Sequence, residues 1–266
     1  MTDGPVLLDV GDDGVARLRL NRPDAANAID LMLGQALAAA ATELADSSKV
    51  RAVLLSGNGA RFCGGGDVRA FAEAAGEGPG LPDKLTGIVA ALHEAIEAFA
   101  RIDAPIIATV HGSAAGAGLS LVALSDVVLA GASTKFVMAY TAIGLTPDGG
   151  STWYLPRIIG LRRAVELTLT NRALSADEAQ EWGLVTRVVP DDTLMAEAEA
   201  LATQLATGPT KSFGAAKRLL ADSLNTTLHD QLANEERELL AAGGRNDARE
   251  GVTAFAEKRG PKFSGS

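Results

Sequence analysis

The feature that most constrains the fold is a series of short strands that are apolar throughout and are separated by helical segments. Arg51–Ser56 and Pro105–Val110 show no alternation of apolar and polar residues, which indicates strands buried on both faces. Between them, Leu85–Ala100 repeats its apolar residues at helical spacing. We therefore predict an α/β fold in which helices cover both faces of a sheet.

The N-terminal segments predict a hairpin, a helix and a loop. Leu7–Val10 and Val15–Leu20 flank the sequence Gly-Asp-Asp-Gly, a strong turn signal that predicts a hairpin. Ile29–Leu44 is rich in Ala and Leu and predicts a helix. Gly76–Pro82 is rich in Gly and Pro and predicts a mobile surface loop.

The pattern changes near Gly160, and the rest of the chain is predicted to be mostly helical. Ser175–Glu178 matches a capping box, and Gly208-Pro209 predicts a helix start with Pro at the first position. Leu184–Val189 is the one remaining segment that resembles a strand. We therefore predict an α/β core over residues 1–190 and a helical region over residues 191–266.

Composition and charge exclude several classes of protein. The chain has 266 residues, and its 47% hydrophobic and 21% charged content is typical of soluble globular proteins. A net charge of −9 argues against nucleic acid as a partner, because binding phosphates requires a basic face. The single cysteine, Cys63, rules out an internal disulfide, and the N-terminus is acidic where a signal peptide would be basic. We expect a cytoplasmic protein.

The longest apolar stretch, Ser113–Ser133, approaches the length of a membrane span. It contains Asp126 and three internal glycines, so we interpret it as a buried helix followed by a buried strand and expect no membrane association. Histidine, cysteine and acidic residues are not clustered at metal-ligand spacing, and no metal is expected.

Three glycine-rich segments follow strands or turns: Arg61–Val68, His111–Ser120 and Gly144–Ser151. Each taken alone fits a structural role, as a tight turn, as close helix–strand packing, or with Asp148 as a turn former or N-cap. The second segment opens an apolar helix, whose start offers unpaired N–H donors to an anion or oxyanion. It lacks the Gly-Lys-Ser/Thr ending of a phosphate-binding loop and the dinucleotide fingerprint.

As an ordered set, these motifs resemble those of the crotonase (enoyl-CoA hydratase/isomerase) superfamily over nearly the whole chain. The likeness runs from Asn21-Arg22-Pro23 through Phe62–Asp67 and Val110–Gly118 to Arg249–Gly251. Within the superfamily, Pro147–Trp153 is most similar to 1,2-epoxyphenylacetyl-CoA and Δ3,Δ2-enoyl-CoA isomerases. The resemblance implies a spiral of ββα units with a helical C-terminal trimerisation region, and hence a homotrimer or hexamer. It also implies an acyl-CoA thioester substrate; coenzyme A is then part of the substrate, and no separate cofactor is expected.

The resemblance also implies the catalytic groups. The backbone N–H groups of Gly66 and Ala117 would donate to the thioester oxygen, where negative charge develops when a proton is removed from the α carbon. Asp148 lies where the similar isomerases keep their catalytic Asp, and it would move the proton. Hydratases of the family carry two glutamates that bind and activate water, and these positions fall on Ser120 and Tyr140. The resemblance therefore favours isomerisation.

The same carry-over gives residues expected to contact the substrate. Ser120 is expected to be a small residue lining the pocket, and Tyr140 is expected to pack against the acyl chain. Coenzyme A is expected to contact the loop 24–26, the segment 64–69 and, from a neighbouring subunit, the C-terminal helix: Asp24, Ala25, Ala26, Gly64, Gly65, Asp67, Val68, Arg69, Phe255 and Lys258.

Three alternative functions remain open on the sequence alone. The first is hydration of a 2-enoyl-CoA by the same framework. The second is a serine hydrolase using Ser113 or Ser120, although no G-x-S-x-G elbow is present. The third is a non-catalytic acyl-CoA-binding protein, which the missing glutamates would allow. Among other polar residues, Glu73, His93 and His229 are expected at the surface, and His111 is expected to make a structural hydrogen bond.

Overall fold

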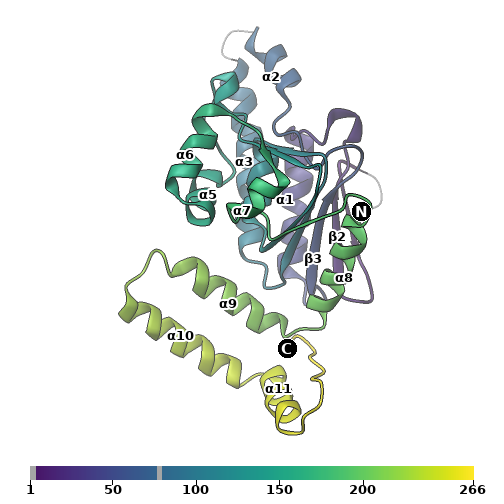
Figure 1. Cartoon of the computed structure of the whole chain (residues 1–266), viewed down its shortest axis with the longest axis vertical. Coiled ribbons are helices and arrows are strands. Elements are labelled where there is room, and N and C mark those ends of the chain that lie inside the picture. Colours follow the sequence, from purple (N-terminus) through teal and green to yellow (C-terminus); the bar gives the residue numbers. More distant parts are fainter. Residues whose placement is uncertain (1–3, 77–79) are drawn as a thin grey trace.

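The computed structural model describes residues 4–76 and 80–266, and its largest element is a six-stranded sheet of order β1-β2-β3-β4-β6-β9 (Figure 1). The first two strands form the predicted antiparallel hairpin, and every later neighbour pair is parallel. The α/β class is therefore confirmed. The strands span Val6–Val10, Val15–Leu20, Ala52–Gly57, Ile106–Val110, Val127–Gly131 and Arg187–Val189.

Helices cover both faces of this sheet (Figure 1). Side chains of β3 alternate between two cores: Val53 and Leu55 join the larger one, and Leu54 joins the smaller one. Helices α1 and α3 contribute to the larger core and α8 to the smaller, which explains why the parallel strands are apolar on both faces. These helices span Leu31–Asp46, Gly80–Ala100 and Leu194–Ala206.

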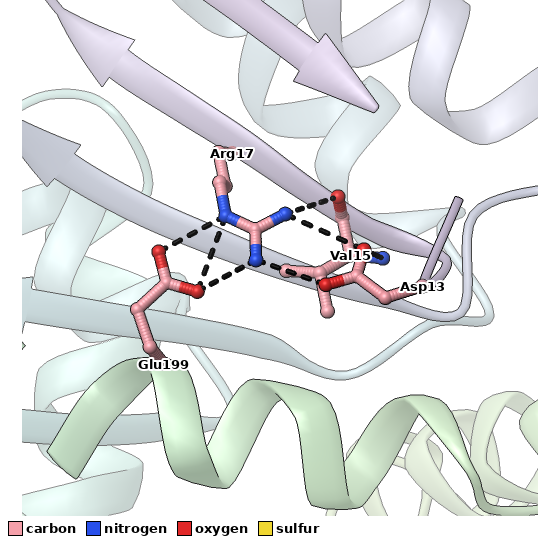
Figure 2. Close-up of polar contacts among 4 residues, drawn as sticks. All are labelled: Asp13, Val15, Arg17 and Glu199. Atoms are coloured by element: carbon pink, nitrogen blue, oxygen red, sulfur yellow. Dashed lines mark hydrogen bonds and ion pairs between the residues drawn. The ribbon is translucent and has the colours of Figure 1, made fainter. Parts of the chain in front are cut away.

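An arginine on β2 links α8 to the sheet (Figure 2). The Nη2 atom of Arg17 lies 2.8 Å from Glu199 Oε2 on α8 and 2.9 Å from Asp13 Oδ2 in the hairpin turn. The two carboxylates, Glu199 first, raise the pKa of the Arg17 guanidinium above its ordinary value. Because all three side chains are partly exposed, each pair contributes about 1 kcal/mol or less.

A second, three-stranded sheet of order β5-β7-β8 lies beside the buried helix α4. Its strands are Ser113–Ala115, Lys135–Val137 and Leu174–Ser175, and α4 spans Ala117–Leu124. The expectation of a buried helix followed by a strand over residues 113–133 is confirmed by α4 and β6, with β5 added before them. Within the described ranges, no helix is both long and apolar enough to cross a membrane.

The last helices, α9 to α11, form a group at one end of the molecule (Figure 1). Ion pairs tie α9 to the α/β core, because Lys217 lies 2.7 Å from Asp126, and Lys211 and Arg218 both reach Asp103. Helix α10 buries none of its residues against the rest of this chain. The remaining helices span Val68–Ala75 (α2), Ser151–Ile159 (α5), Leu161–Thr170 (α6), Ala176–Glu181 (α7), Thr210–Asp222 (α9), Leu228–Gly243 (α10) and Asn246–Ala256 (α11).

Several boundaries differ from the predicted ones. Helix α1 begins two residues later than predicted, because Asp30 caps it by accepting a hydrogen bond from the Leu33 N–H at 2.8 Å. Of the predicted loop at 76–82, residues 77–79 lie outside the described residues, whereas residues 80–82 form the first turn of α3. Proline is tolerated there because the first N–H groups of a helix have no internal partner.

In the C-terminal half, the capping box of Ser175 and Glu178 is confirmed with both reciprocal hydrogen bonds. Helix α9 begins one residue later than predicted, so that Pro209 is its N-cap rather than its first residue. The strand predicted over residues 184–189 is shorter, at Arg187–Val189, and the two-residue strand β8 was not predicted.

Candidate active site

The first glycine-rich segment is held by two short β-bridges, one to the second glycine-rich segment and one to Ile29. Cys63 pairs in parallel with Ala114, with the Cys63 N–H donating to Ser113 O at 3.2 Å. Gly66 pairs in the same way with Ile29, whose N–H donates to Gly65 O at 2.7 Å. Main-chain ladders therefore fix the position of the segment that carries Gly66.

Two glycines are required where these segments approach one another. Gly65 has a φ of 97°, and a Cβ there would lie 2.8 Å from the Ala115 carbonyl oxygen. A Cβ at Gly118 would lie 2.6 Å from the Cys63 carbonyl oxygen. Any side chain at either position would therefore push the two segments apart.

The N–H groups of Gly66 and Ala117 make no hydrogen bond with any group in the described part of the chain. Ala117 is the first residue of α4, where the N–H has no partner within the helix, and the helix dipole adds positive potential. One neighbouring amide of each is occupied, because the Asp67 N–H donates to Ile29 O and the Gly116 N–H to Val137 O. Gly66 and Ala117 both line the same cavity.

This main cavity has a volume of about 430 Å³. Besides Gly66 and Ala117, its wall contains Asp148 and Tyr140, and the rest is largely apolar. An apolar wall excludes water and strengthens any electrostatic interaction made inside. The apolar side chains come mainly from α2, α3 and the loop after β7: Ile29, Val68, Phe71, Leu85, Ile88, Val89, Leu92, Ile143 and Leu145.

The main chain of Asp148 is held by three side chains. Its carbonyl oxygen accepts from the Ser120 hydroxyl at 3.0 Å and from the Ser151 hydroxyl at 2.9 Å. The next N–H, of Gly149, donates to Nε2 of His93 on α3 at 3.4 Å. Left-handed backbone at Gly149 and Gly150 lets the chain turn sharply here before α5 begins.

The hydroxyl of Tyr140 donates a hydrogen bond to Oδ1 of Asp148. Tyr140 was expected only to pack against an acyl chain; its ring does line the cavity, but its polar end is bound to the carboxylate. Burial first, and the charge of Asp148 second, raise the pKa of the Tyr140 hydroxyl well above its ordinary value. The hydroxyl therefore stays protonated and acts as a donor.

A second cavity, of about 460 Å³, adjoins the main one through Gly66 and Val68. It brings together six of the residues predicted to contact coenzyme A: Asp24, Ala25, Ala26, Asp67, Val68 and Arg69. Arg22 also lines it and pairs with Asp67 at 3.2 Å and Asp30 at 3.1 Å. Gly64 and Gly65, also predicted, line the main cavity instead.

Comparison with known proteins identifies the family. The family model for enoyl-CoA hydratase/isomerase matches residues 11–266. The chain belongs to the enoyl-CoA hydratase/isomerase family. Solved structures of this family share its fold: the enoyl-CoA hydratase of Mycobacterium smegmatis superposes with a TM-score of 0.90 at 32% identity, covering 98% of this chain and 99% of that one.

Curated relatives of this family member differ in the reaction they are named for. It is 39% identical over 254 residues to the 1,2-epoxyphenylacetyl-CoA isomerase of Escherichia coli, with 96% of each chain covered. It is 35% identical over 248 residues to a 4-chlorobenzoyl coenzyme A dehalogenase of an Arthrobacter species, covering 92% of this chain and 88% of that one. Membership of the enoyl-CoA hydratase/isomerase family therefore does not by itself fix the reaction.

Three predicted contact residues of this family member do not line either cavity within the described chain. Ser120 is fully buried and holds the Asp148 main chain. Phe255 is 87% exposed on α11, a helix that lies at the far end of the molecule (Figure 1), and exposed Lys258 follows shortly after that helix ends. Their predicted contact from a neighbouring subunit stays a prediction. Ser113 also lies outside the cavities, so neither serine is presented as a nucleophile.

Sequence reasoning missed three residues that organise the enoyl-CoA hydratase/isomerase site. Buried Asn27 donates from Nδ2 to the carbonyl oxygens of Asn58, Arg61 and Phe62, and so supports the first glycine-rich segment. Arg22 and His93 also bind partners that are distant in sequence. No local pattern signals such contacts.

Other polar residues lie close to their predicted environments. His111 makes the expected structural hydrogen bond, to Gly59 O at 2.9 Å. Glu73, His93 and His229 are exposed, as predicted, although Glu73 lines the second cavity and His93 accepts a hydrogen bond from the Gly149 N–H. Across residues 4–76 and 80–266, no group of three or more His, Cys, Asp or Glu residues could hold a metal ion.

Proposed function

We propose that this enzyme isomerises an acyl-CoA thioester by moving a proton between carbons of the acyl group, with Asp148 as the acid–base residue. One observation carries the proposal: of the described residues that line the main cavity, Asp148 is the sole carboxylate, and it shares that cavity with both unpaired N–H groups. A base and two preorganised donors in one apolar cavity are what enolate chemistry requires.

The proposed reaction is balanced without a further reagent. The Asp148 carboxylate takes a proton from the α carbon of a 3-enoyl-CoA, and the electron pair of the broken C–H bond delocalises onto the thioester oxygen. The N–H groups of Gly66 and Ala117 bind that oxygen. The protonated Asp148 then returns the proton to the γ carbon, and the double bond lies between the α and β carbons. A related ring isomerisation would use the same groups.

The residues at the two glutamate positions support isomerisation over hydration. Ser120 has no carboxylate, and its hydroxyl is used to hold the Asp148 main chain. Tyr140 has no carboxylate either, and its hydroxyl is bound to the Asp148 side chain. Neither group is available to take a proton from a water molecule, so water addition lacks a base beyond Asp148 itself.

The second cavity is proposed to receive the nucleotide end of coenzyme A. Arg69 lines this cavity as a cation, and Arg22, which is paired with Asp67 and Asp30, lines it as well. We propose that copies of the chain assemble as trimers or hexamers through the C-terminal helices, because α10 exposes a row of leucines that includes Leu239, 74% exposed. Phe255 and Lys258 would then contact coenzyme A in a neighbouring subunit. A reducing compartment, the cytoplasm, fits the single buried Cys63.

The test compares a 3-enoyl-CoA with a 2-enoyl-CoA, using wild type, Asp148→Asn and the control Asp192→Asn. Asp192 is an exposed aspartate in the turn before α8. We expect isomerisation to exceed hydration, and Asp148→Asn to lower kcat at least about 100-fold, the usual contribution of acid–base catalysis. Asp192→Asn should match wild type. Faster hydration than isomerisation, or full isomerase activity in Asp148→Asn, would contradict the proposal.

A further inference from the structure

We propose that Tyr140 is a positioning residue, whose hydroxyl fixes the rotation of the Asp148 carboxylate so that Oδ2 alone is presented to the substrate. The inference rests on the proposed role of Asp148 and adds a second residue to it. Its starting point is the hydrogen bond from the Tyr140 hydroxyl to Oδ1. No other described group bonds to the carboxylate oxygens of Asp148.

The main chain of Asp148 is already fixed by hydrogen bonds. Ser120 on α4 and Ser151 on α5 both donate to its carbonyl oxygen, and His93 on α3 accepts from the next N–H. Three helices therefore hold the backbone. The freedom that remains is the rotation of the carboxyl group about its side-chain torsions, of which the terminal one has a broad minimum.

Little else in the cavity can restrain the rotation of the Asp148 carboxyl group. Most of the neighbouring wall is made of apolar side chains such as Leu92, Ile143 and Leu145, which offer no donor to a carboxylate. The lining also includes the hydroxyl residue Thr146, for which the described contacts give no hydrogen bond to this carboxylate. A hydrogen bond from a hydroxyl to an ionised carboxylate is shorter and stronger than a neutral one. Tyr140 is therefore the group able to keep one oxygen in place while the other reacts.

Tyr140 also lies close to one of the two unpaired amides. The Tyr140 ring lies against the start of α4, since a Cβ at Gly116 would be 3.8 Å from Cε2 of Tyr140. Gly116 immediately precedes Ala117, whose N–H is one of the two proposed oxyanion donors. The Tyr140 side chain thus binds the base at one end and lies beside the residue that precedes the donor, so it relates the position of the Asp148 carboxylate to that of the Ala117 N–H.

The experiment compares Tyr140→Phe with Tyr154→Phe, which removes the hydroxyl of the chain's second tyrosine. We expect Tyr140→Phe to lower kcat about 10- to 100-fold, the value of one hydrogen bond to a charged group, with KM changed less than about twofold. Tyr154→Phe should match wild type.

Failure of the inference can be told apart from failure of the proposed function. If Asp148→Asn is inactive but Tyr140→Phe equals Tyr154→Phe, the positioning role is wrong and the role of Asp148 stands. If Asp148→Asn is fully active, both are wrong. A Tyr140→Phe variant with a raised KM and an unchanged kcat would also overturn positioning. In the Asp148→Asn background, adding Tyr140→Phe should change the residual rate less than about twofold.

A second measurement does not depend on activity or on the folding of Tyr140→Phe. In Tyr154→Phe protein grown with 3-fluorotyrosine, Tyr140 gives the single fluorine NMR signal, because the chain has two tyrosines. Replacing Asp148 by Asn should shift this signal, whereas replacing exposed Asp192 by Asn should leave it in place. An identical signal with and without the Asp148 carboxylate would overturn the contact.

Discussion

Replacing Ala117 by proline removes one proposed oxyanion donor while keeping the fold. Ala117 is the first residue of α4, a position where proline is favoured because the missing N–H has no helical partner. The preceding Gly116 has φ 50° and ψ −123°, the mirror image of an extended conformation, which a glycine before proline can adopt. We therefore expect Ala117→Pro to unfold at close to the wild-type temperature.

The loss of activity can be estimated from the chemistry. Removing one preorganised donor to an oxyanion costs about 3–4 kcal/mol, or roughly 10²–10³-fold in kcat. The proline ring would also project along the former N–H direction, toward the thioester oxygen. The expected loss of kcat/KM is therefore at least about 100-fold.

The assay measures kcat/KM for a 3-enoyl-CoA together with thermal unfolding. The matched control is Leu31→Pro, which places proline at the first position of α1, where the preceding Asp30 is extended and the leucine is 39% exposed. It should keep both the activity and the unfolding temperature. A folded Ala117→Pro enzyme with more than about a tenth of wild-type kcat/KM would show that this amide is no oxyanion donor.

Two further predictions concern stability. Gly65→Ala should lower the free energy of unfolding by about 1–3 kcal/mol in urea titrations, because Gly65 has a φ of 97° and a Cβ there would meet Ala115 O. The control Gly243→Ala, whose added Cβ meets no atom within 4 Å, should leave the free energy of unfolding unchanged. Equal stabilities of the two variants would contradict the close approach. The Arg259 side chain, and next the backbone N–H of Lys262, lower the pKa of Glu250 from 4.5 to about 2. The ionised carboxylate therefore stabilises the C-terminal segment above pH 4.5, and this stabilisation is lost as the pH falls toward 2. The protection factors of residues 257–266 in hydrogen exchange, which correct for the intrinsic rate at each pH, should therefore fall over that range, and also at pH 7 in Glu250→Gln; unchanged protection factors in both would refute the link.

The fold was largely predictable, because strands buried on both faces and long amphipathic helices carry strong periodic signals. What failed was short or local. β5 and β8, of three and two residues, are too short for any periodicity. The first turn of α3 was assigned to a loop because Gly80 and Pro82 dominate its composition, although neither is excluded from a helix start.

The candidate site was predictable where it depends on local motifs and unpredictable where it depends on distant contacts. Gly66, Ala117 and Asp148 were implied by the family resemblance of three motifs in order, and all three residues line the cavity. The bond between Tyr140 and Asp148 spans a left-handed turn at Gly144, whose geometry a residue pattern does not give. Contacts such as that of His93 with the turn after Asp148 join elements more than fifty residues apart.

The close packing of Gly149 against Ser120 has a consequence for how this scaffold can change its chemistry. A Cβ at Gly149 would lie 3.0 Å from the Ser120 Cβ, so the bend that presents Asp148 passes close to this fully buried residue. A longer side chain at 120 is therefore expected to displace the bend. An acid at 120 and the present bend at 149 compete for one volume. Converting such an enzyme to water addition therefore calls for changing residues 144–150 as a unit. Exchanging single residues would leave the side chain at 120 in steric conflict with the bend at 149.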